Sequence, residues 1–306
     1  MNITLVHNSK IDTIKWNALL DAETYDAVFG YTWYLNAVDA NWQAVIVNDY
    51  EAVCAVCYGK VLAVKSLQNP VFTPQMGVYG NKNYAKAITH YLNKLFKLIR
   101  YTSAQKLEFN VRQSVSTRVK QVLPMNGNYD VLHDGYSTNH KRNIKKATAT
   151  ISLEDSDDVP AFTQIIKHNL KYEVFTDANL DTMQRLINTA LARNEGFIVN
   201  AYTTDYQLAA TACFITQGNE LLFLKGATLP IGRSLGAMHL LFDSVINTYC
   251  NTHQLLDFGG SNATTLAQFN KGFGANDVTY YMYSKNFNRP LVKFLASSKR
   301  IIKRLR

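Results

Sequence analysis

The sequence predicts a mixed α/β (α+β) fold in which helices and strands alternate along both halves of the chain. In the segment 221–258, a short apolar run, a turn with Pro230 and Gly232, a helical apolar stripe and a second apolar run follow one another. This is a βαβ order, and a helical crossover of this kind usually implies parallel strand pairing. Three runs between 197 and 228 are joined by tight turns, which predicts antiparallel neighbours. The sequence therefore predicts mixed central sheets.

The first half is expected to begin with two short helices, a β-hairpin and a third strand. A loop rich in Pro and Gly then precedes a long helix, whose apolar residues recur at helical spacing, and one more strand. In chain order, these elements are expected at 16–20, 31–38, 42–47, 52–58, 61–67, 69–80, 84–99 and 107–111.

A domain boundary is expected near residue 130, in the segment 124–134. Ser137 can cap the helix that follows, and a strand, two helices, three strands, the βαβ segment, a short helix and a last strand complete the second half. Outside the βαβ segment, the ranges after the capped helix are 149–153, 159–170, 180–192, 197–202, 208–216, 264–272 and 278–284. The chain is thus expected to divide into residues 1–130, residues 131–284 and a C-terminal segment 285–306.

Composition and charge narrow the class of protein. The 306 residues are long for one domain, and the 47% hydrophobic and 18% charged residues are ordinary for a packed globular protein. The formal net charge of +9 is compatible with an anionic partner. No stretch approaches the roughly 20 apolar residues that span a bilayer, and the N-terminus lacks a signal-peptide core. The protein is therefore expected to be soluble and cytoplasmic.

Motifs for metal or hydrolase chemistry are missing from the sequence. There is no His-x-x-x-His, no G-x-S-x-G and no P-loop, and the histidines are scattered without ligand spacing. Cys54 and Cys57 form a C-x-x-C inside a predicted strand, where residues three apart point to opposite faces. We therefore expect no metal site, and the four cysteines are expected to be buried free thiols.

Three motifs in the second half carry a resemblance to a known family: NHKRNIKKA (139–147), LDFGGSN (256–262) and FNKGFGA (269–275). The element order of the second half resembles the GNAT acyltransferase fold, and the first half follows a looser version of it. Two such units in one chain resemble the FemABX family and other FemAB-like acyltransferases. The resemblance implies tandem GNAT-like domains that pack side by side with a cleft between them.

In GNAT enzymes, the turn into the central helix binds the pyrophosphate of acyl-CoA with its backbone amides. The pattern of this turn is [QR]-x-x-G-x-[GA], and Arg233 and Gly236 match it. Free amides and the positive end of the helix dipole are the physical basis of such a site. Met238 replaces the last small residue and could crowd a pyrophosphate, and a plain tight turn is the alternative. The residues of this predicted anion site are Gly232, Arg233, Ser234, Gly236 and Ala237.

The resemblance also suggests a catalytic carboxylate. Asp257 ends the strand after the central helix, where it could accept a proton from an attacking amine. The alternative is a structural Asp that hydrogen-bonds the turn Gly259–Gly260. GNAT enzymes often place a Tyr in the next helix to protonate the CoA thiolate, and this chain has none between 263 and 273. This favours a FemABX-like site, a donor other than CoA, or loss of activity.

Basic residues could contact phosphates of the substrate. Arg142, Lys145 and Lys146 share one face of the predicted helix, which could engage tRNA or a lipid- or nucleotide-linked substrate. FemABX-like enzymes have a phosphate-binding Lys in F-K-x-x-F-G, where this chain has Asn270, and Lys271 is one residue further on. The alternative for all four cations is that they are simply solvated.

The resemblance implies a transferase that moves an acyl group from acyl-CoA (acetyl-CoA), or an aminoacyl group from aminoacyl-tRNA, to an amine acceptor. The amine would attack the bound thioester or ester directly, without a metal ion or a covalent nucleophile. The partners are then an anionic small-molecule donor or tRNA, and cell-envelope or polysaccharide biosynthesis is the setting. A catalytically inactive binding protein with the GNAT fold is the alternative.

The C-terminal segment 285–306 predicts a basic amphipathic helix. After Pro290, apolar residues recur near one face, and Lys and Arg residues from Lys293 onward carry positive charges that no acid offsets. Such a helix could make peripheral contact with an anionic membrane surface, bind nucleic acid, or pack its apolar face on the first domain.

Overall fold

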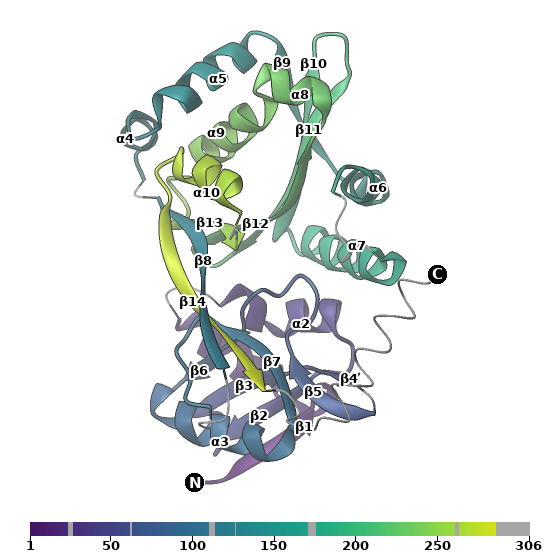
Figure 1. Ribbon diagram of the computed structural model, residues 1–306, viewed down its shortest axis with the longest axis vertical. Coiled ribbons are helices and arrows are strands. Elements are labelled where there is room, and N and C mark those ends of the chain that lie inside the picture. The colour runs from purple at the N-terminus through teal and green to yellow at the C-terminus, as the bar shows by residue number, and fades with distance from the viewer. Residues whose placement is uncertain are drawn as a thin grey trace.

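The computed structural model describes residues 1–23, 27–61, 63–109, 114–125, 127–170, 176–260 and 263–285. The molecule is elongated, with two lobes arranged along its long axis (Figure 1). Most of the N-terminal half builds the lobe at the bottom of this view, and most of the C-terminal half builds the upper lobe. The mixed α/β fold class that the sequence predicts is confirmed.

The helices and strands follow one another in an irregular alternation. In the first half they are β1 (Ile3–His7), α1 (Thr13–Asp21), α2 (Thr32–Val38), β2 (Gln43–Val47), β3 (Ala52–Val56), β4 (Tyr58–Val61), β5 (Val64–Gln68), β6 (Val78–Gly80), α3 (Ala85–Leu95), β7 (Leu98–Ser103) and β8 (Ser114–Pro124). In the second half they are α4 (Tyr129–Asp134), α5 (Thr138–Thr148), β9 (Ile151–Ser156), α6 (Val159–Asn169), α7 (Asp177–Ala192), β10 (Gly196–Thr203), β11 (Leu208–Gln217), β12 (Glu220–Thr228), α8 (Pro230–Leu235), α9 (Ala237–Tyr249), β13 (Leu255–Gly260), α10 (Thr264–Lys271) and β14 (Asn276–Lys285).

The described strands form a four-stranded sheet in the order β1-β2-β3-β6 and a ten-stranded sheet in the order β4-β5-β7-β14-β8-β13-β12-β11-β10-β9. The predicted hairpin of β2 and β3 and the antiparallel set of β10, β11 and β12 are confirmed. The predicted parallel pair of the βαβ segment is also confirmed, because β12 and β13 run in the same direction.

Two long strands connect the lobes. β14 pairs with β7 of the lower lobe through Tyr281–Lys285 and with β8 over Asn276–Ser284, and β8 pairs in turn with β13 of the upper lobe (Figure 1). β8 precedes the boundary expected near residue 130 and β14 follows it, so the two halves of the chain exchange strands across that boundary. The division into residues 1–130 and 131–284 stays a prediction.

Three elements of the first half differ from the prediction. The helix expected to reach residue 99 ends at Leu95, and Leu98–Ser103 form the largely buried strand β7. A short apolar run is compatible with a helix or a strand, and here pairing with strands on both sides makes it a strand. Leu107–Phe109 form no strand, and the rest of that expected run lies outside the described residues. β8 was not expected, because its first half is exposed and polar and carries no apolar alternation.

Helix capping follows the sequence closely. The Ser137 hydroxyl accepts a hydrogen bond from the backbone N–H of His140 (3.2 Å), and Asp158 and Thr176 cap α6 and α7 in the same way. Each cap satisfies an amide that the first helical turn leaves without a partner inside the helix. These caps fix where α5, α6 and α7 begin.

Helices cover both faces of the sheet in the upper lobe. Ile198 and Cys213 face a core formed with α6 and α7, whereas Val199 and Phe214 face a core that includes residues of α5 and α9. This division follows from the alternation of side chains along each strand. The cysteines are buried and free, as predicted.

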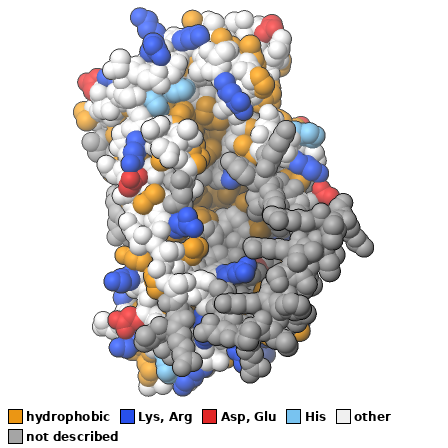
Figure 2. All heavy atoms as spheres, viewed as in Figure 1, with side chains coloured by type: hydrophobic (Ala, Val, Ile, Leu, Met, Phe, Trp, Pro, Cys, Tyr) orange, Lys and Arg blue, Asp and Glu red, His pale blue; other side chains and the backbone are white. Residues whose placement is uncertain are grey.

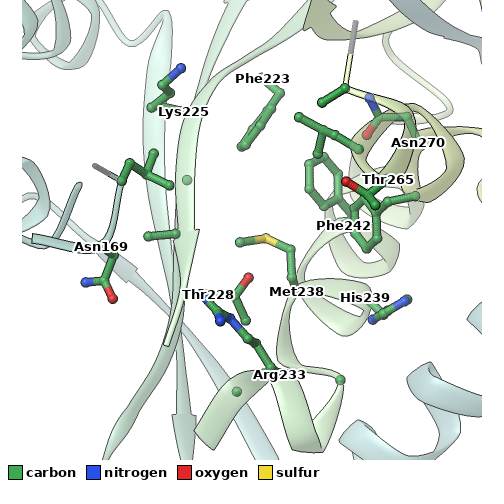
Figure 3. Close-up of a pocket in the computed structure, with 18 residues that line it drawn as sticks. Asn169, Phe223, Lys225, Thr228, Arg233, Met238, His239, Phe242, Thr265 and Asn270 are labelled. Atoms are coloured by element: carbon green, nitrogen blue, oxygen red, sulfur yellow. The ribbon is translucent and has the colours of Figure 1, made fainter. Parts of the chain in front are cut away.

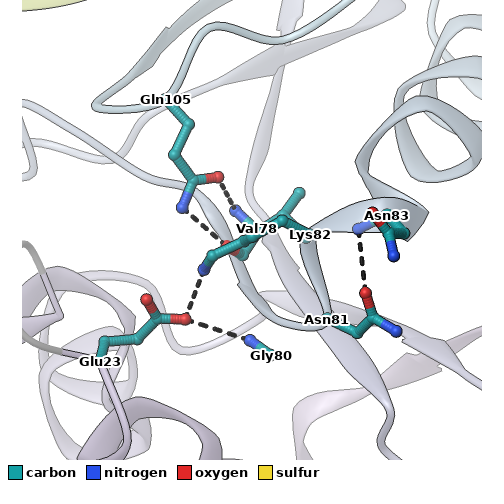
Figure 4. A network of polar contacts seen from close by, with 7 residues as sticks. All are labelled: Glu23, Val78, Gly80, Asn81, Lys82, Asn83 and Gln105. Carbon is teal, nitrogen blue, oxygen red and sulfur yellow. Dashed lines mark hydrogen bonds and ion pairs between the residues drawn. The ribbon is translucent and has the colours of Figure 1, made fainter.

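Side chains cover the edge of the four-stranded sheet that is formed by β6. β6 pairs with β3 on one side, and on the other Gln105 exchanges hydrogen bonds of 3.0 and 2.8 Å with the backbone of Val78 (Figure 4). Glu23 accepts a hydrogen bond from the N–H of Gly80 (3.2 Å) and from the Lys82 ammonium. This network satisfies backbone groups that an open edge would leave available for pairing with another chain.

The lobes also touch through α2 and α7. The guanidinium of Arg185 donates to the carbonyl of Ala37 (2.6 Å), and the indole N–H of Trp33 donates to Gln217 Oε1 (2.9 Å). The guanidinium of Arg193 lies 5.4 Å from the centre of the Trp33 ring. Polar contacts therefore fix this part of the lobe interface.

The predicted basic helix at the C-terminus lies outside the described residues, apart from Lys285 at the end of β14. Across the ranges that the structure does describe, no helix combines the length and apolar character needed to cross a membrane.

Candidate functional site

A cavity opens where β12 and β13 part. The two strands pair only from Glu220 to Leu222, whereas the pairing of β12 with β11 continues to Thr228. Beyond Leu222, the edge of β12 that faces β13 therefore borders open space. The cavity there has a volume of about 540 Å³, a size typical of small-molecule sites.

Side chains from four helices and one strand line this cavity. In the space-filling view, hydrophobic side chains gather in a hollow of the upper lobe (Figure 2). The close-up shows Met238, Phe242 and Phe223 on the α9 side of β12, and Lys225 and Asn169 on its other side (Figure 3). The labelled lining residues are Asn169, Phe223, Lys225, Thr228, Arg233, Met238, His239, Phe242, Thr265 and Asn270.

A β-bulge at Leu224 sets the direction of the side chains on β12. Phe214 pairs with Phe223 and Cys213 pairs with Lys225, so Leu224 is an extra residue on β12. Cross-strand partners point to the same face, which places Lys225 with Cys213 on the α6 and α7 side. The cavity consequently reaches both faces of the sheet around the free edge of β12.

The predicted anion site is built differently from an open turn. Residues Pro230–Leu235 form the short helix α8, and Gly236, with φ of +80°, joins it to α9. A Cβ atom on Gly232 would lie 2.0 Å from the carbonyl oxygen of Ala209, so this glycine allows α8 to pack on β11. Gly232, Arg233 and Gly236 line the cavity. Arg233 is exposed, and its contact with an anion stays a prediction.

The other two residues of that predicted site have different surroundings. The hydroxyl of Ser234 donates to the carbonyl of Ile231 (2.7 Å), and Ala237 is fully buried. Neither is among the residues that line the cavity. Met238, which replaces a small residue of the GNAT pattern, does line it, so a pyrophosphate would meet this side chain.

Asp257 makes the contacts expected of a structural residue that hydrogen-bonds the turn at Gly259. Its Oδ1 accepts a hydrogen bond from the N–H of Gly259 (2.7 Å), and its Oδ2 lies 2.7 Å from the ammonium of Lys120. The side chain of Asp257 is 10% exposed and that of Lys120 is 3% exposed. Asp257 is not among the residues that line the cavity. Its role as a proton acceptor stays a prediction.

The predicted substrate-binding cations occupy separate places. Lys146 donates to the carbonyl of Ser234 (2.7 Å), which brings α5 against α8, whereas Arg142 donates to Asn139 (2.9 Å) and Lys145 is exposed. Lys271 pairs with Asp277 (2.6 Å) and is not a lining residue, whereas its neighbour Asn270 is. Their contacts with substrate stay predictions.

A pair of histidines beside the cavity was not singled out from the sequence. The rings of His140 and His239 are 4.7 Å apart, and the backbone carbonyl of Phe269 lies 2.9 Å from His140 Nε2. Burial lowers the pKa of His140, and burial together with the neighbouring His140 lowers the pKa of His239 to about 4. His239 lines the cavity as a neutral imidazole at neutral pH, able to accept a proton.

The histidine pair also explains why two sequence motifs occur together. A Cβ atom on Gly272 would lie 1.9 Å from the His140 ring, so the glycine of FNKGFGA makes room for the histidine of NHKRNIKKA. The backbone N–H of Ser137 donates to the carbonyl of Gly272 (2.9 Å). Both motifs are visible in the sequence, but only the fold shows that α5 and α10 meet and that His140 packs on Gly272.

Within the described ranges, no group of three or more His, Cys, Asp or Glu side chains is arranged to hold a metal ion.

Comparison with known proteins supports the fold. Neither a family model nor a curated protein sequence matches the chain. Among solved structures, it is similar to FemX, with 11% identity, a TM-score of 0.72 and coverage of 96% of this chain and 99% of that one. A tandem GNAT protein from the clavulanic acid biosynthesis pathway has a TM-score of 0.55, 12% identity and coverage of 94% and 100%. L-PGS from Bacillus licheniformis has a TM-score of 0.54, 11% identity and coverage of 96% and 97%.

At these identities the likeness shows the fold alone. It confirms the FemAB-like and GNAT fold that the motifs and element order implied. Fold and site therefore define a protein with a FemAB-like, GNAT-type fold and a cavity where two parallel strands part.

Proposed function

We propose that this protein transfers an acyl or aminoacyl group from an activated donor to an amine at the cavity between β12 and β13. The observation that supports this is the cavity itself, which lies at the end of the parallel pairing in a fold shared with FemX and a tandem GNAT protein. The free edge of β12 can align a donor along the strand by backbone hydrogen bonds.

The amine nitrogen attacks the donor carbonyl, a C–N bond forms, and the C–S or C–O bond to the leaving group breaks. The proton lost by the amine ends on the leaving thiolate or alkoxide. Orientation and hydrogen bonds to the developing oxyanion supply most of the rate in such a reaction. His239 is the neutral imidazole that lines the cavity, and it can carry the proton between the two groups.

Two donors fit this proposal, acyl-CoA and aminoacyl-tRNA. Arg233, at the rim of the cavity, favours a donor with phosphates, whereas Met238 narrows the space for a pyrophosphate. The basic side chains of α5 beside α8 favour a larger polyanion such as tRNA. A cytoplasmic enzyme that adds amino acids or acyl groups to cell-envelope or polysaccharide amines agrees with either donor.

Ligand-induced stabilisation tests the proposal. Titration with acetyl-CoA should raise the melting temperature saturably if CoA is the donor, because the ligand binds only the folded state. Aminoacylated total tRNA tests the other donor. Filter binding measures its affinity for the protein, and transfer of labelled amino acid to amines measures its reaction. Arg233→Ala should weaken the response to the true donor.

A matched pair of variants on α10 locates the site. Thr265 and Thr264 are both exposed, but only Thr265 lines the cavity. Thr265→Trp should fill the cavity and abolish binding and transfer, and Thr264→Trp should leave both unchanged. Equal behaviour of the two variants would place the reaction elsewhere.

An inactive binding protein is the second candidate. Both carboxylate oxygens of Asp257 have partners in the protein, and α10 carries no Tyr. Saturable binding of a donor without transfer to any amine would favour this candidate.

A further inference from the structure

A second cavity lies beside the cavity of the candidate site, between the two lobes. Its volume is about 350 Å³, and Phe29 and Phe72 of the lower lobe form part of its wall. Phe223, Lys225 and Leu266 line both cavities, so the two cavities are neighbours with a shared wall. A ligand in the first cavity that extends past this wall therefore enters the second cavity.

The lining of the second cavity is mainly apolar. Among the described lining residues, Thr73 and Lys225 carry polar side chains, and the others are Phe, Leu, Pro or Gly. Both polar side chains are engaged within the protein, because the hydroxyl of Thr73 donates to the carbonyl of Val71 (3.3 Å) and Lys225 interacts with another group of the chain. The lining side chains therefore favour a hydrocarbon group over a polar one.

The two cavities follow one another along β12. Residues 222–225 of this strand line the second cavity, whereas Phe223 and residues 225–228 line the first. Figure 3 shows Phe223 near one end of the first cavity and Arg233 near the other. The first cavity thus has a cationic end at Arg233 and an opposite end that leads to the apolar second cavity.

This order gives a direction to the proposed donor. A donor whose phosphates contact Arg233 directs its acyl group along β12 toward the second cavity. An acetyl group has a single methyl carbon beyond the carbonyl and leaves the second cavity empty, whereas a longer aliphatic chain fills it. Such a chain also covers Leu266, which is 46% exposed at the junction of the two cavities. Removal of this apolar surface from water favours the longer chain.

We propose that the second cavity binds the aliphatic chain of the donor acyl group, so that this protein transfers an acyl group longer than acetyl from a thioester to an amine. This inference rests on the proposed function, because it concerns the same donor. The amine nitrogen forms a bond to the acyl carbon, the C–S bond to the leaving thiolate breaks, and the proton of the amine ends on that thiolate.

Two alcohols test the chain-binding cavity without any turnover. Butanol and octanol differ only in methylene groups, and each buried methylene should raise the affinity roughly fourfold. Octanol should therefore bind the full-length protein roughly a hundredfold more tightly than butanol. Ligand-observed NMR measures both affinities, and nuclear Overhauser effects should join the terminal methyl group of octanol to the ring of Phe72.

Two substitutions change the volume of the second cavity in opposite directions. Leu224 and Phe72 line this cavity and not the first. Leu224→Trp fills it and should reduce the octanol-to-butanol affinity ratio roughly tenfold. Phe72→Ala enlarges it and should allow decanol to gain affinity over octanol. Leu95→Trp makes the first exchange at an exposed leucine of α3, outside both cavities, and should leave the ratio unchanged.

These measurements can overturn the inference in three ways. An octanol-to-butanol ratio near one would show that no chain is buried. Contacts of the octanol methyl group only with residues outside the second cavity would place the chain elsewhere. Equal ratios in Leu224→Trp and Leu95→Trp would do the same, and opposite shifts in Leu224→Trp and Phe72→Ala would support the inference even if one of the two variants is less stable.

Transfer assays then test the source of the chain. The wild-type protein should have a higher kcat/KM for octanoyl-CoA than for acetyl-CoA, and Leu224→Trp should reduce this preference. A preference for long alkylamines as acceptors of an acetyl group, with none for long acyl donors, would assign the chain to the acceptor and overturn the inference. Absence of any transfer, with an octanol ratio that still responds to Leu224→Trp, would contradict only the proposed function.

Discussion

Asp257 shows how one residue can satisfy a motif and still have its charge fully engaged. The carboxylate joins the turn at Gly259 to the buried ammonium of Lys120 on the neighbouring strand β8. Because β8 comes from the first half of the chain and β13 from the second, this ion pair also ties the two halves together. Because both side chains are buried, breaking this ion pair should cost more free energy of unfolding than breaking a surface pair.

Asp257→Asn should destabilise the protein by about 3 to 5 kcal/mol, because it removes a carboxylate from a buried ammonium. Lys271→Met, which breaks a partly exposed pair with Asp277, should cost less than about 1 kcal/mol. Urea unfolding measures both changes. Similar small losses would show that the buried pair is not important for stability, and unchanged transfer by folded Asp257→Asn would show that Asp257 accepts no proton.

His239 should make stability depend on pH. Its folded-state pKa of about 4 lies below the ordinary value of 6.5, so the unfolded state binds the proton more readily. The neutral form therefore contributes stability that is present above pH 6.5 and is lost as the pH falls toward 4. NMR titration of the ring protons should give a midpoint near 4, and a midpoint near 6.5 would contradict the structure. His239→Phe should reduce the loss of stability over this range, and the part that comes from the lowered pKa of His140 should remain.

At the scale of elements, glycine positions decide how α8 and α9 meet the sheet. Gly232 lies against the backbone of Ala209, and Gly236 lies against the backbone of α5 at Asn143. Close packing of the segment 230–237 on β11 and α5 is thus enough to require glycine at both positions. The helices α8 and α9 meet at Gly236, whose backbone is left-handed, and this arrangement places Arg233 at the rim of the cavity.

Gly232→Ala should destabilise the protein strongly, because its Cβ would lie 2.0 Å from a backbone oxygen that cannot move freely. Gly218→Ala is the control for an added methyl group without a clash, since no atom lies within 4 Å of the position that a Cβ on Gly218 would take, although its φ of +56° is left-handed. The control should cost only about 1 to 2 kcal/mol for its left-handed backbone. Thermal unfolding compares them, and a larger loss in the control would contradict the packing of α8.

For the whole molecule, the shared strands β8 and β14 predict cooperative unfolding. Trp16, Trp33 and Trp42 all lie in the first half, so tryptophan fluorescence reports on the lower lobe, whereas far-UV circular dichroism reports on both. The two signals should follow the same denaturant curve, because the ten-stranded sheet that joins the lobes needs strands from both halves of the chain. Separate transitions would show that the lobes unfold independently.

The sequence alone determined the order of most elements. Apolar periodicity, turn residues and the Ser137 cap carry this information locally, so the βαβ segment, the hairpin of β2 and β3 and the helices α5 to α7 could be predicted. The motifs around residues 139–147 and 269–275 also pointed to the correct fold, since each is needed for the packing of His140 on Gly272.

The tertiary structure decided what depends on contacts between distant segments. β8 has no local strand pattern and forms because β13 and β14 pair with its two edges. Three features join residues that are far apart in the chain. These are the cavity, the histidine pair and the ion pair of Asp257 with Lys120. Local periodicity records which face a residue prefers, but the neighbours across that face are set by how the chain folds back on itself.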